Sequence, residues 1–353
     1  MRPLGLPGEE GSCILANSCP YADPPRGEGE RKGGGAGGGS RRPNAVARIL
    51  VYAADADQYL GLLREAAPHF EIAAASTPEQ AAAHLDADIL FAWGIPPELV
   101  ARMPNLCWVQ WLGAGVDRVV GALPPHVPLT RVVGAFGGVM TEHVFAFLLA
   151  IRHDIFRMRS LQAERRWEKV PAQQLRGQRL GVAGLGAIGR EIVGVGRAFG
   201  MEVWGLSRSG QHGDIVDRHF RTDELIDFAA GVDNLVLVLP ATPDTDGLFG
   251  AQAFAAMREG AVLVNVGRGN AVDEEALAAA LRAGRPAFAQ LDVFRSEPLP
   301  PESPLWGLPN CFISAHCSGP SEARRVGEFA AANLRRYAAG EPLAGIVERA
   351  RGY

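Results

Sequence analysis

Three ionisable residues follow three apolar segments in the second half of the chain. Arg268, Glu297 and His316 come soon after residues 261–266, 287–291 and 312–314, whose composition is that of buried strands. Ligands of a parallel α/β sheet bind beyond the carboxyl ends of its strands. We therefore expect these three side chains at one rim of one sheet.

The three side-chain types suit the reduction of a carbonyl group. An imidazole such as that of His316 can give a proton to the forming alkoxide near neutral pH, and a carboxylate such as Glu297 can fix the tautomer of the ring and stabilise its charge. A guanidinium such as that of Arg268 can hold a substrate carboxylate and polarise the carbonyl beside it. None of the three can supply a hydride, so this chemistry requires a cofactor.

A glycine-rich segment provides a place for such a cofactor. It consists of Gly184, Leu185, Gly186, Ala187, Ile188 and Gly189, between an apolar strand at 180–183 and a helix at 188–198. Glycines in this pattern allow a tight turn, close approach of the backbone to a pyrophosphate and close helix-to-strand packing. The N–H groups at the start of the helix then receive the phosphates. The pattern alone is weak, but its position between strand and helix predicts a Rossmann fold that binds a nicotinamide dinucleotide.

The end of the next strand bears on which dinucleotide binds. NAD-binding folds usually place an acid there for the ribose hydroxyls. The strand at 202–206 instead ends in Ser207, Arg208 and Ser209, and Glu202 lies too early in it to reach the ribose. A cation with neighbouring hydroxyls suits a 2′-phosphate, which favours NADP(H) over NAD(H). The alternative is that Arg208 is an ordinary surface arginine in an arginine-rich chain.

The elements that would position these residues alternate between strand and helix, which is typical of doubly wound parallel sheets. The first stretch has expected strands at 48–52, 70–73, 88–92 and 106–112, with helices at 58–66 and 78–85. The second has expected strands at 180–183, 202–206, 234–239, 261–266, 287–291 and 312–314, with helices at 188–198, 222–230, 251–258 and 273–282. Asp273 is the expected N-cap of the last of these helices. An amphipathic helix at 141–159 precedes the second stretch, and a helix at 321–339 follows it.

These elements predict an α/β fold with two doubly wound parallel-sheet domains. Residues 1–44 are rich in glycine, proline and charge and are expected to form a disordered tail. Residues 45–140 would form a flavodoxin-like substrate domain, and residues 141–318 a Rossmann NAD(P)-binding domain. Since the second sheet is complete without it, the final segment, 319–353, is expected to return to the first domain.

Bulk composition argues against several classes of protein. The chain has 353 residues, 47% of them hydrophobic, and a formal net charge of -4, with no basic stripe for nucleic acid. Its longest apolar run, at 144–151, is far shorter than the roughly 20 residues that span a bilayer. The five cysteines form no metal-binding or disulfide pattern, so we expect no metal site and a reduced, cytoplasmic environment.

Several ordered motifs resemble those of the D-isomer-specific 2-hydroxyacid dehydrogenase family, in the branch of the glyoxylate/hydroxypyruvate reductases. They lie at residues 113–117, 181–189, 239–243, 265–269, 291–299 and 314–316, and the resemblance covers the chain from about residue 45 to its end. Motifs that recur together in this order are far more specific than any one of them.

The resemblance implies a role for each matching residue. His316 would be the acid/base, Glu297 its partner and Arg268 the cation that binds the substrate. The backbone N–H groups of Ala114 and Gly115 would hold the substrate carboxylate. The cofactor site would further include Asp292, at the nicotinamide end, and Leu239, Pro240, Thr245, Val266, Gly267 and Ser318. Members of the family usually form a homodimer through the cofactor domain, and the helix at 141–159 would suit that role.

Two positions depart from the common family pattern. Ser207 stands where NAD-specific members have an acid, as in NADPH-preferring glyoxylate/hydroxypyruvate reductases, and Ala315 precedes the histidine where many members have proline. We therefore expect a cytoplasmic reductase that uses NADPH to convert a small 2-oxo acid, such as glyoxylate or hydroxypyruvate, to the D-2-hydroxy acid. One alternative is an NAD-linked biosynthetic dehydrogenase with a 3-phosphoglycerate-like substrate. Another is a non-catalytic, dinucleotide-sensing corepressor.

Overall fold

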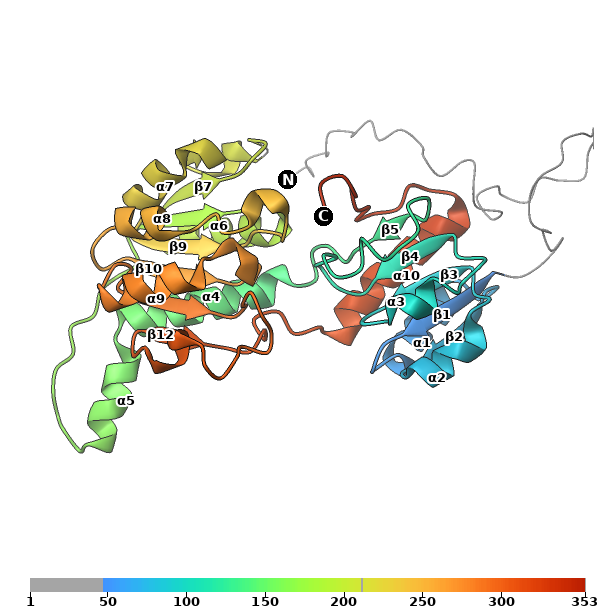
Figure 1. Ribbon diagram of the computed structural model, residues 1–353, viewed down its shortest axis with the longest axis horizontal. Coiled ribbons are helices and arrows are strands. Elements are labelled where there is room, and N and C mark those ends of the chain that lie inside the picture. Colours follow the sequence, from blue (N-terminus) through green and yellow to red (C-terminus); the bar gives the residue numbers. More distant parts are fainter. Residues whose placement is uncertain (1–46, 211, 353) are drawn as a thin grey trace, which may run out of the picture. The chain divides into compact units, whose positions relative to one another are not determined.

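The computed structural model describes residues 47–210 and 212–352 (Figure 1). The tail predicted at 1–44 lies outside the described residues. The described residues divide into two compact units, of which unit 1 holds those up to Val132 together with Glu322–Glu348, and unit 2 holds those from Val133 to Ser321 together with Arg349–Gly352. Each unit is built on one parallel sheet, which confirms the predicted α/β fold class with two doubly wound domains.

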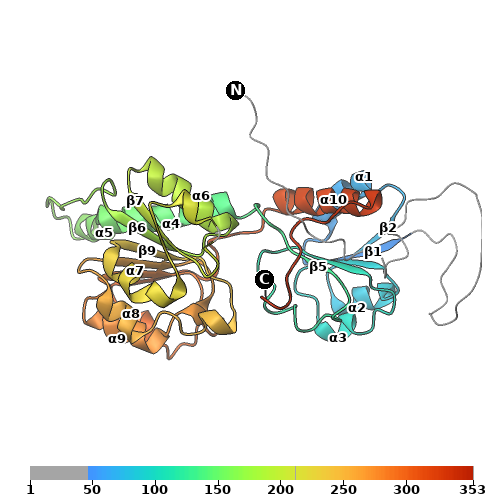
Figure 2. The same ribbon diagram turned by 90° about the horizontal axis from the view of Figure 1, so that it is seen from above.

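Unit 1 has helices on both faces of its sheet. Its strands are β1 (Arg48–Tyr52), β2 (Glu71–Ala75), β3 (Ile89–Ala92), β4 (Trp108–Trp111) and β5 (Leu129–Thr130), and its helices are α1 (Asp57–Ala66), α2 (Pro78–Ala81), α3 (Pro97–Val100) and α10 (Ala323–Ala339). The strand order β2-β1-β3-β4-β5 is that of flavodoxin-like folds. Figure 2 shows α1 and α10 over one face and α2 and α3 over the other. Coverage of both faces explains why every residue of β3 and β4 is buried.

The last helix, α10, packs on unit 1. Gly327 lies so close to α1 that a Cβ there would come within 2.8 Å of a leucine side chain. Further along the helix, Tyr337 stacks on Trp108, with ring centroids 5.1 Å apart. The buried amide of Asn333 donates a hydrogen bond to Gln110 Oε1 at 2.8 Å. Aromatic stacking and a buried polar contact to β4 therefore tie the C-terminal segment to this sheet.

Unit 2 is built on seven parallel strands. They are β6 (Arg179–Ala183), β7 (Glu202–Leu206), β8 (Arg218–Phe220), β9 (Asn234–Leu237), β10 (Val262–Asn265), β11 (Phe288–Leu291) and β12 (Cys311–Ile313). Their order, β12-β11-β10-β9-β6-β7-β8, is the Rossmann order with one strand added at an edge. Its topological switch point falls between β6 and β9, which is where dinucleotides bind in such sheets.

The edge strand β8 is not predicted by the sequence pattern. It has only three residues, Arg218–Phe220, and their alternation is too short to signal a strand. Its pairing with β7, in which His219 lies opposite Gly205, is what makes it a strand. That pairing is a tertiary contact, and it brings His219 beside Ser207 at the end of β7.

The helices of unit 2 cover both faces of its sheet. They are α4 (Gly137–Arg152), α5 (Ile155–Ala163), α6 (Ala187–Ala198), α7 (Leu225–Gly231), α8 (Ala251–Ala256) and α9 (Glu274–Arg282), with short 3-10 turns between several elements. Figure 2 shows α4 and α6 over one face and α7, α8 and α9 over the other. The predicted N-cap of α9 is confirmed, because the Asp273 side chain accepts a hydrogen bond from Ala276 N at 3.0 Å. Within residues 47–210 and 212–352 we find no helical segment that could serve as a membrane span.

The single helix predicted at 141–159 is wrong, because two helices occupy this stretch. Asp154 adopts a left-handed φ of 52° between α4 and α5, which interrupts the helical hydrogen bonding. The first helix also begins earlier, at Gly137, which lies against the carboxylate of Glu191 in α6. As a result the division between the units falls at Val132 and not at residue 140.

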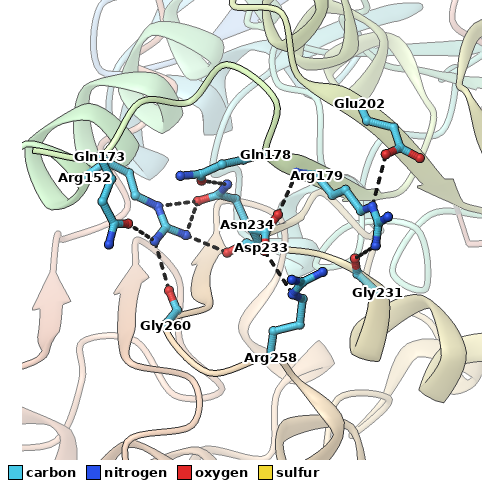
Figure 3. A network of polar contacts seen from close by, with 10 residues as sticks. All are labelled: Arg152, Gln173, Gln178, Arg179, Glu202, Gly231, Asp233, Asn234, Arg258 and Gly260. Carbon is cyan, nitrogen blue, oxygen red and sulfur yellow. Dashed lines mark hydrogen bonds and ion pairs between the residues drawn. The ribbon is translucent and has the colours of Figure 1, made fainter.

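A buried arginine ties the end of α4 to the amino ends of the strands (Figure 3). Arg152 is 8% exposed, and its guanidinium makes hydrogen bonds of 2.7 to 3.1 Å to two side chains and two main-chain carbonyls. The acceptors are Asn234 Oδ1, Gln173 Oε1, Gly260 O and Asp233 O. All of the N–H groups of the guanidinium are used, since Asn234 receives two of them. This network lies at the opposite end of the strands from the predicted rim of functional residues.

Candidate active site

The glycine-rich segment forms the turn between β6 and α6, and the structural requirement for glycine differs from one position to the next. Gly184 has a left-handed φ of 102°, and a Cβ on it would lie 2.5 Å from the carbonyl oxygen of Val238. A Cβ on Gly189 would overlap the carbonyl oxygen of Gly184. Gly186 is the N-cap of α6 with an ordinary φ of -71°, and a Cβ on it would meet no atom within 4 Å. The open space over Gly186, in front of the first helical N–H groups, fits the pyrophosphate of a dinucleotide.

The segments after β9 and β10 continue the same rim. Thr245 Oγ1 donates to the carbonyl oxygen of Pro240 at 2.7 Å, which fixes the turn after β9. Gly267 lies against that turn, because a Cβ on it would be 2.6 Å from Leu239 N. Val266, which precedes Gly267, is buried, with 3% of its surface exposed. The turns after β9 and β10 therefore lie in direct contact within unit 2.

At the end of β7, two predicted residues have partners that the sequence did not indicate. Ser207 Oγ lies 2.8 Å from His219 Nε2, and Arg208 Nη1 donates to Asp244 Oδ2 at 2.8 Å. His219 reaches Ser207 only because β8 pairs with β7. Asp244 comes from the turn after β9, so the Arg208–Asp244 ion pair spans the switch point of the sheet. No acid stands at the ribose position, and the carboxylate of Glu202 is engaged by Trp204 and Arg179.

His316 and Glu297 are in direct contact. The distance from His316 Nδ1 to Glu297 Oε2 is 2.9 Å, and the two side chains are 50% and 20% exposed. The other carboxylate oxygen of Glu297 accepts a hydrogen bond from Phe294 N at 3.1 Å. His316 has a left-handed φ of 49° and donates its own N–H to Asp292 O at 2.8 Å. The carboxylate is thus held on one side and aligns the imidazole on the other, with the ring open to solvent.

Asp292 supports the turn that presents His316. It is fully buried, and its carboxylate accepts hydrogen bonds from Ser314 Oγ at 2.6 Å, from Cys317 N at 2.9 Å and from Ser318 N at 2.9 Å. Burial raises the pKa of the Asp292 carboxyl, but the hydrogen bonds from Ser314, Ser318 and Cys317 outweigh it and hold that pKa below its usual value. Asp292 is therefore ionised at neutral pH, and its carboxylate anchors the side chain of Ser314 before the histidine and the backbone of Cys317 and Ser318 after it.

Arg268 lies on a neighbouring segment of the same rim. Its carbonyl oxygen accepts from Asn265 Nδ2 at 3.1 Å, and its Nη1 donates to Gly267 O at 2.9 Å. The next residue, Gly269, is pressed against the main chain of Phe294, where any Cβ would overlap. This close approach brings the turn after β10 against the segment that carries Glu297.

Ala114 and Gly115 belong to unit 1, at the carboxyl end of β4.

Comparisons with known proteins identify the family of the chain. Residues 145–318 match the model of the family described as D-isomer specific 2-hydroxyacid dehydrogenase, NAD binding domain. The chain is 33% identical over 275 residues to glyoxylate/hydroxypyruvate reductase A of Serratia proteamaculans, covering 76% of this chain and 88% of that one. A solved D-isomer specific 2-hydroxyacid dehydrogenase family protein of Aeromonas salmonicida is 38% identical with a TM-score of 0.80, covering 86% of this chain and 100% of that one. A D-isomer specific 2-hydroxyacid dehydrogenase of Xanthobacter autotrophicus, solved with NADPH and MES, is 34% identical with a TM-score of 0.79, covering 88% and 100%.

The matched model covers the sheet that carries the glycine-rich turn, Arg268, Glu297 and His316, and the similarity to whole relatives extends over both units. The family expected from the motifs is thereby confirmed. This chain belongs to the D-isomer specific 2-hydroxyacid dehydrogenase family and is an NAD(P)-dependent oxidoreductase.

Proposed function

We propose that this enzyme reduces a small 2-oxo acid, such as glyoxylate or hydroxypyruvate, to the D-2-hydroxy acid, with NADPH as the favoured cofactor. The observation that carries the proposal is the His316–Glu297 pair at the rim of a sheet that matches an NAD-binding domain. The name of the Serratia relative supports the substrate class. Related structures solved with NADPH or NADP support the cofactor.

In this proposal His316 gives a proton to the carbonyl oxygen of the substrate as that oxygen gains negative charge. Since Nδ1 faces Glu297 Oε2, Nε2 is the atom that delivers the proton. The Glu297 carboxylate orients the ring and stabilises its charged form. Arg268 binds the substrate carboxylate and polarises the adjacent carbonyl. The bound nicotinamide supplies the hydride.

The overall reaction has a direct test. Absorbance of the reduced nicotinamide reports oxidation of NADPH in the presence of glyoxylate or hydroxypyruvate, and we expect turnover with at least one of them. A panel of other 2-oxo acids extends the measurement. If none of them is reduced while NADPH still binds, the proposed function is wrong, and a sensing role for the dinucleotide takes its place.

The proposal also includes a cytoplasmic location and a homodimer. The cysteines of the described residues, Cys107, Cys311 and Cys317, form no disulfide there, which suits a reducing compartment. Large apolar side chains are exposed along α5, where Ile155 is 48%, Phe156 40% and Met158 40% exposed. Exposed apolar side chains gathered on one helix are typical of a protein interface, here with a second copy of the chain.

Replacing Gly186 with valine tests the phosphate turn. The added side chain would enter the space over the start of α6, so we expect the Kd of NADPH to rise at least tenfold, about 1.4 kcal/mol. Gly250→Val is the matched control, because Gly250 is the N-cap of α8 in a similar extended conformation and its Cβ would meet only one atom, at 3.7 Å. Fluorescence titration gives Kd, and thermal unfolding without NADPH should be alike in both variants. Unchanged NADPH affinity in Gly186→Val would contradict the assignment.

Replacing Arg208 with leucine tests the choice of cofactor. We expect the ratio of kcat/KM for NADPH to that for NADH to fall about tenfold or more, since hydrogen bonds to a charged group contribute about 1.5–3 kcal/mol. Asp244→Asn should have the opposite effect, a gain of a few fold for NADPH, because the 2′-phosphate no longer competes with a carboxylate for Arg208. Equal or better use of NADH by the wild type would contradict the preference for NADPH. It would not contradict the proposed reduction of a 2-oxo acid.

A further inference from the structure

The turn after β4 in unit 1 presents two backbone amides. Its carbonyl groups are occupied, because Gly113 O accepts from Val132 N at 3.0 Å and Ala114 O accepts from Arg131 Nη1 at 3.3 Å. Among the residues that the structure describes, none accepts a hydrogen bond from the N–H of Ala114 or of Gly115. Adjacent turn amides without a protein acceptor are available to an anion.

The bond from Arg131 sets the direction of one of these amides. The carbonyl of Ala114 and the N–H of Gly115 belong to one planar peptide unit and point in opposite directions. A guanidinium that holds the carbonyl therefore aims the Gly115 N–H away from itself. The main chain of Arg131 is anchored separately, by donation of its own N–H to Gly345 O at 2.9 Å. A change of the side chain alone can thus release the peptide without removing this main-chain contact.

Trp93 borders the same turn. It follows β3, the strand that pairs with β4, and 49% of it is exposed, which is a large exposed fraction for a tryptophan. Its ring lies against the main chain of Gly113, where any Cβ would overlap the indole, and its centroid is 5.4 Å from that of Trp111. Contact with the tilted ring of Trp111 and with the turn holds the indole in place. The indole of Trp93 therefore borders the turn that carries the two amides.

We propose that Arg131 and Trp93 are the residues with which unit 1 selects the substrate. Arg131 positions the Gly115 amide to receive the substrate carboxylate, and Trp93 restricts the group attached to the 2-oxo carbon to a small one. The inference rests on the proposed function and gives a physical reason for a preference for short 2-oxo acids. Arg131 is a positioning residue, because it acts through the peptide that it holds, and Trp93 determines specificity by steric exclusion.

The arginine is tested by titrating oxalate into the NADPH-saturated enzyme in a calorimeter. Arg131→Met removes the donor, and we expect oxalate binding to weaken and the KM for glyoxylate to rise at least tenfold, with kcat and the Kd of NADPH changed less than twofold. Arg131→Lys keeps a charged donor and should recover part of the loss. Arg64→Met, at an exposed arginine of α1, is the matched control and should bind oxalate as the wild type does. Unweakened oxalate binding by Arg131→Met overturns this role.

The tryptophan is tested by the relative use of large and small substrates. Trp93→Ala should raise kcat/KM for 4-methyl-2-oxopentanoate at least tenfold relative to that for glyoxylate. Trp306→Ala is the control, because Trp306 is 53% exposed in unit 2 and should leave this ratio as it is. An unchanged ratio in Trp93→Ala overturns the specificity role.

Failure of this inference can be told apart from failure of the proposed function. If the wild-type enzyme reduces no 2-oxo acid, the proposed function is wrong, but the oxalate titrations still decide the role of Arg131. Weaker binding by Arg131→Met then supports a carboxylate site at the turn, and equal binding overturns it. A wild-type enzyme that binds no oxalate overturns the inference outright.

Discussion

Replacing His316 with asparagine is expected to lower kcat for the reduction of glyoxylate by roughly 10²- to 10⁴-fold, the range that general acid–base catalysis contributes. The imidazole is half exposed and lies 2.9 Å from Glu297, so it is the group of the pair that can pass a proton to a substrate, and an amide cannot replace it. Asparagine is preferred to alanine because the φ of 49° at this position is a left-handed conformation that asparagine tolerates. Steady-state kinetics at saturating NADPH measures the loss.

The loss should be confined to the chemical step. We expect the Kd of NADPH, measured by fluorescence titration, to be unchanged in His316→Asn, because the phosphate turn lies on another strand of the sheet. His69→Asn, at an exposed histidine of unit 1, is the matched control and should keep full activity. Retention of more than about a tenth of the wild-type kcat would show that His316 is not the proton donor.

A double variant tests whether His316 and Glu297 act as one unit. Glu297→Gln keeps the shape of the side chain and an oxygen for the Phe294 N–H, but it removes the charge beside Nδ1. If the carboxylate acts only through the imidazole, His316→Asn combined with Glu297→Gln is no slower than His316→Asn alone. Losses that multiply in the double variant would show that Glu297 acts by a separate route.

Replacing Arg152 with methionine is expected to destabilise unit 2 by about 2–4 kcal/mol, because a buried acceptor left without a donor costs about 1–3 kcal/mol. Methionine fills much of the same volume but donates no hydrogen bond. The change leaves Asn234 Oδ1 and the carbonyl of Gly260 without their donor, whereas Asp233 O keeps its hydrogen bond from Val262 N at 3.0 Å. Native-state hydrogen exchange at the amides of β9 measures the free energy of opening in this part of the sheet.

The controls for Arg152 separate this network from ordinary surface charge. Arg157→Met removes an exposed ion pair with Glu168, whose N–O distance is 3.7 Å, and should cost less than about 1 kcal/mol. Arg152→Lys restores the charge but not the planar fork of donors, so we expect most of the loss to remain. Where the variants are folded, kcat should be as in the wild type, because the network lies at the amino ends of the strands. A loss below about 1 kcal/mol in Arg152→Met would contradict the expected stabilisation by this network.

Much of the site follows from short segments of sequence. The glycine-rich turn is encoded locally, since Gly184 needs its φ of 102° and Gly189 must approach Gly184, and both requirements lie within six residues. Arg268 and Glu297 follow the buried strands β10 and β11, His316 follows the partly buried edge strand β12, and parallel strands all end at the same edge of their sheet. Burial and strand direction are therefore enough to predict that these side chains share one rim.

Tertiary structure alone decided which partners these residues meet. His219 reaches Ser207 across 12 residues through the pairing of β8 with β7, and Asp244 reaches Arg208 across 36. Arg152 reaches Gln173 across 21 residues and Gly260 across 108. The alternation of apolar and polar residues reports whether each position faces the core, because that depends on its immediate neighbours in one element. It does not report which distant segments come together, because that depends on how whole elements pack.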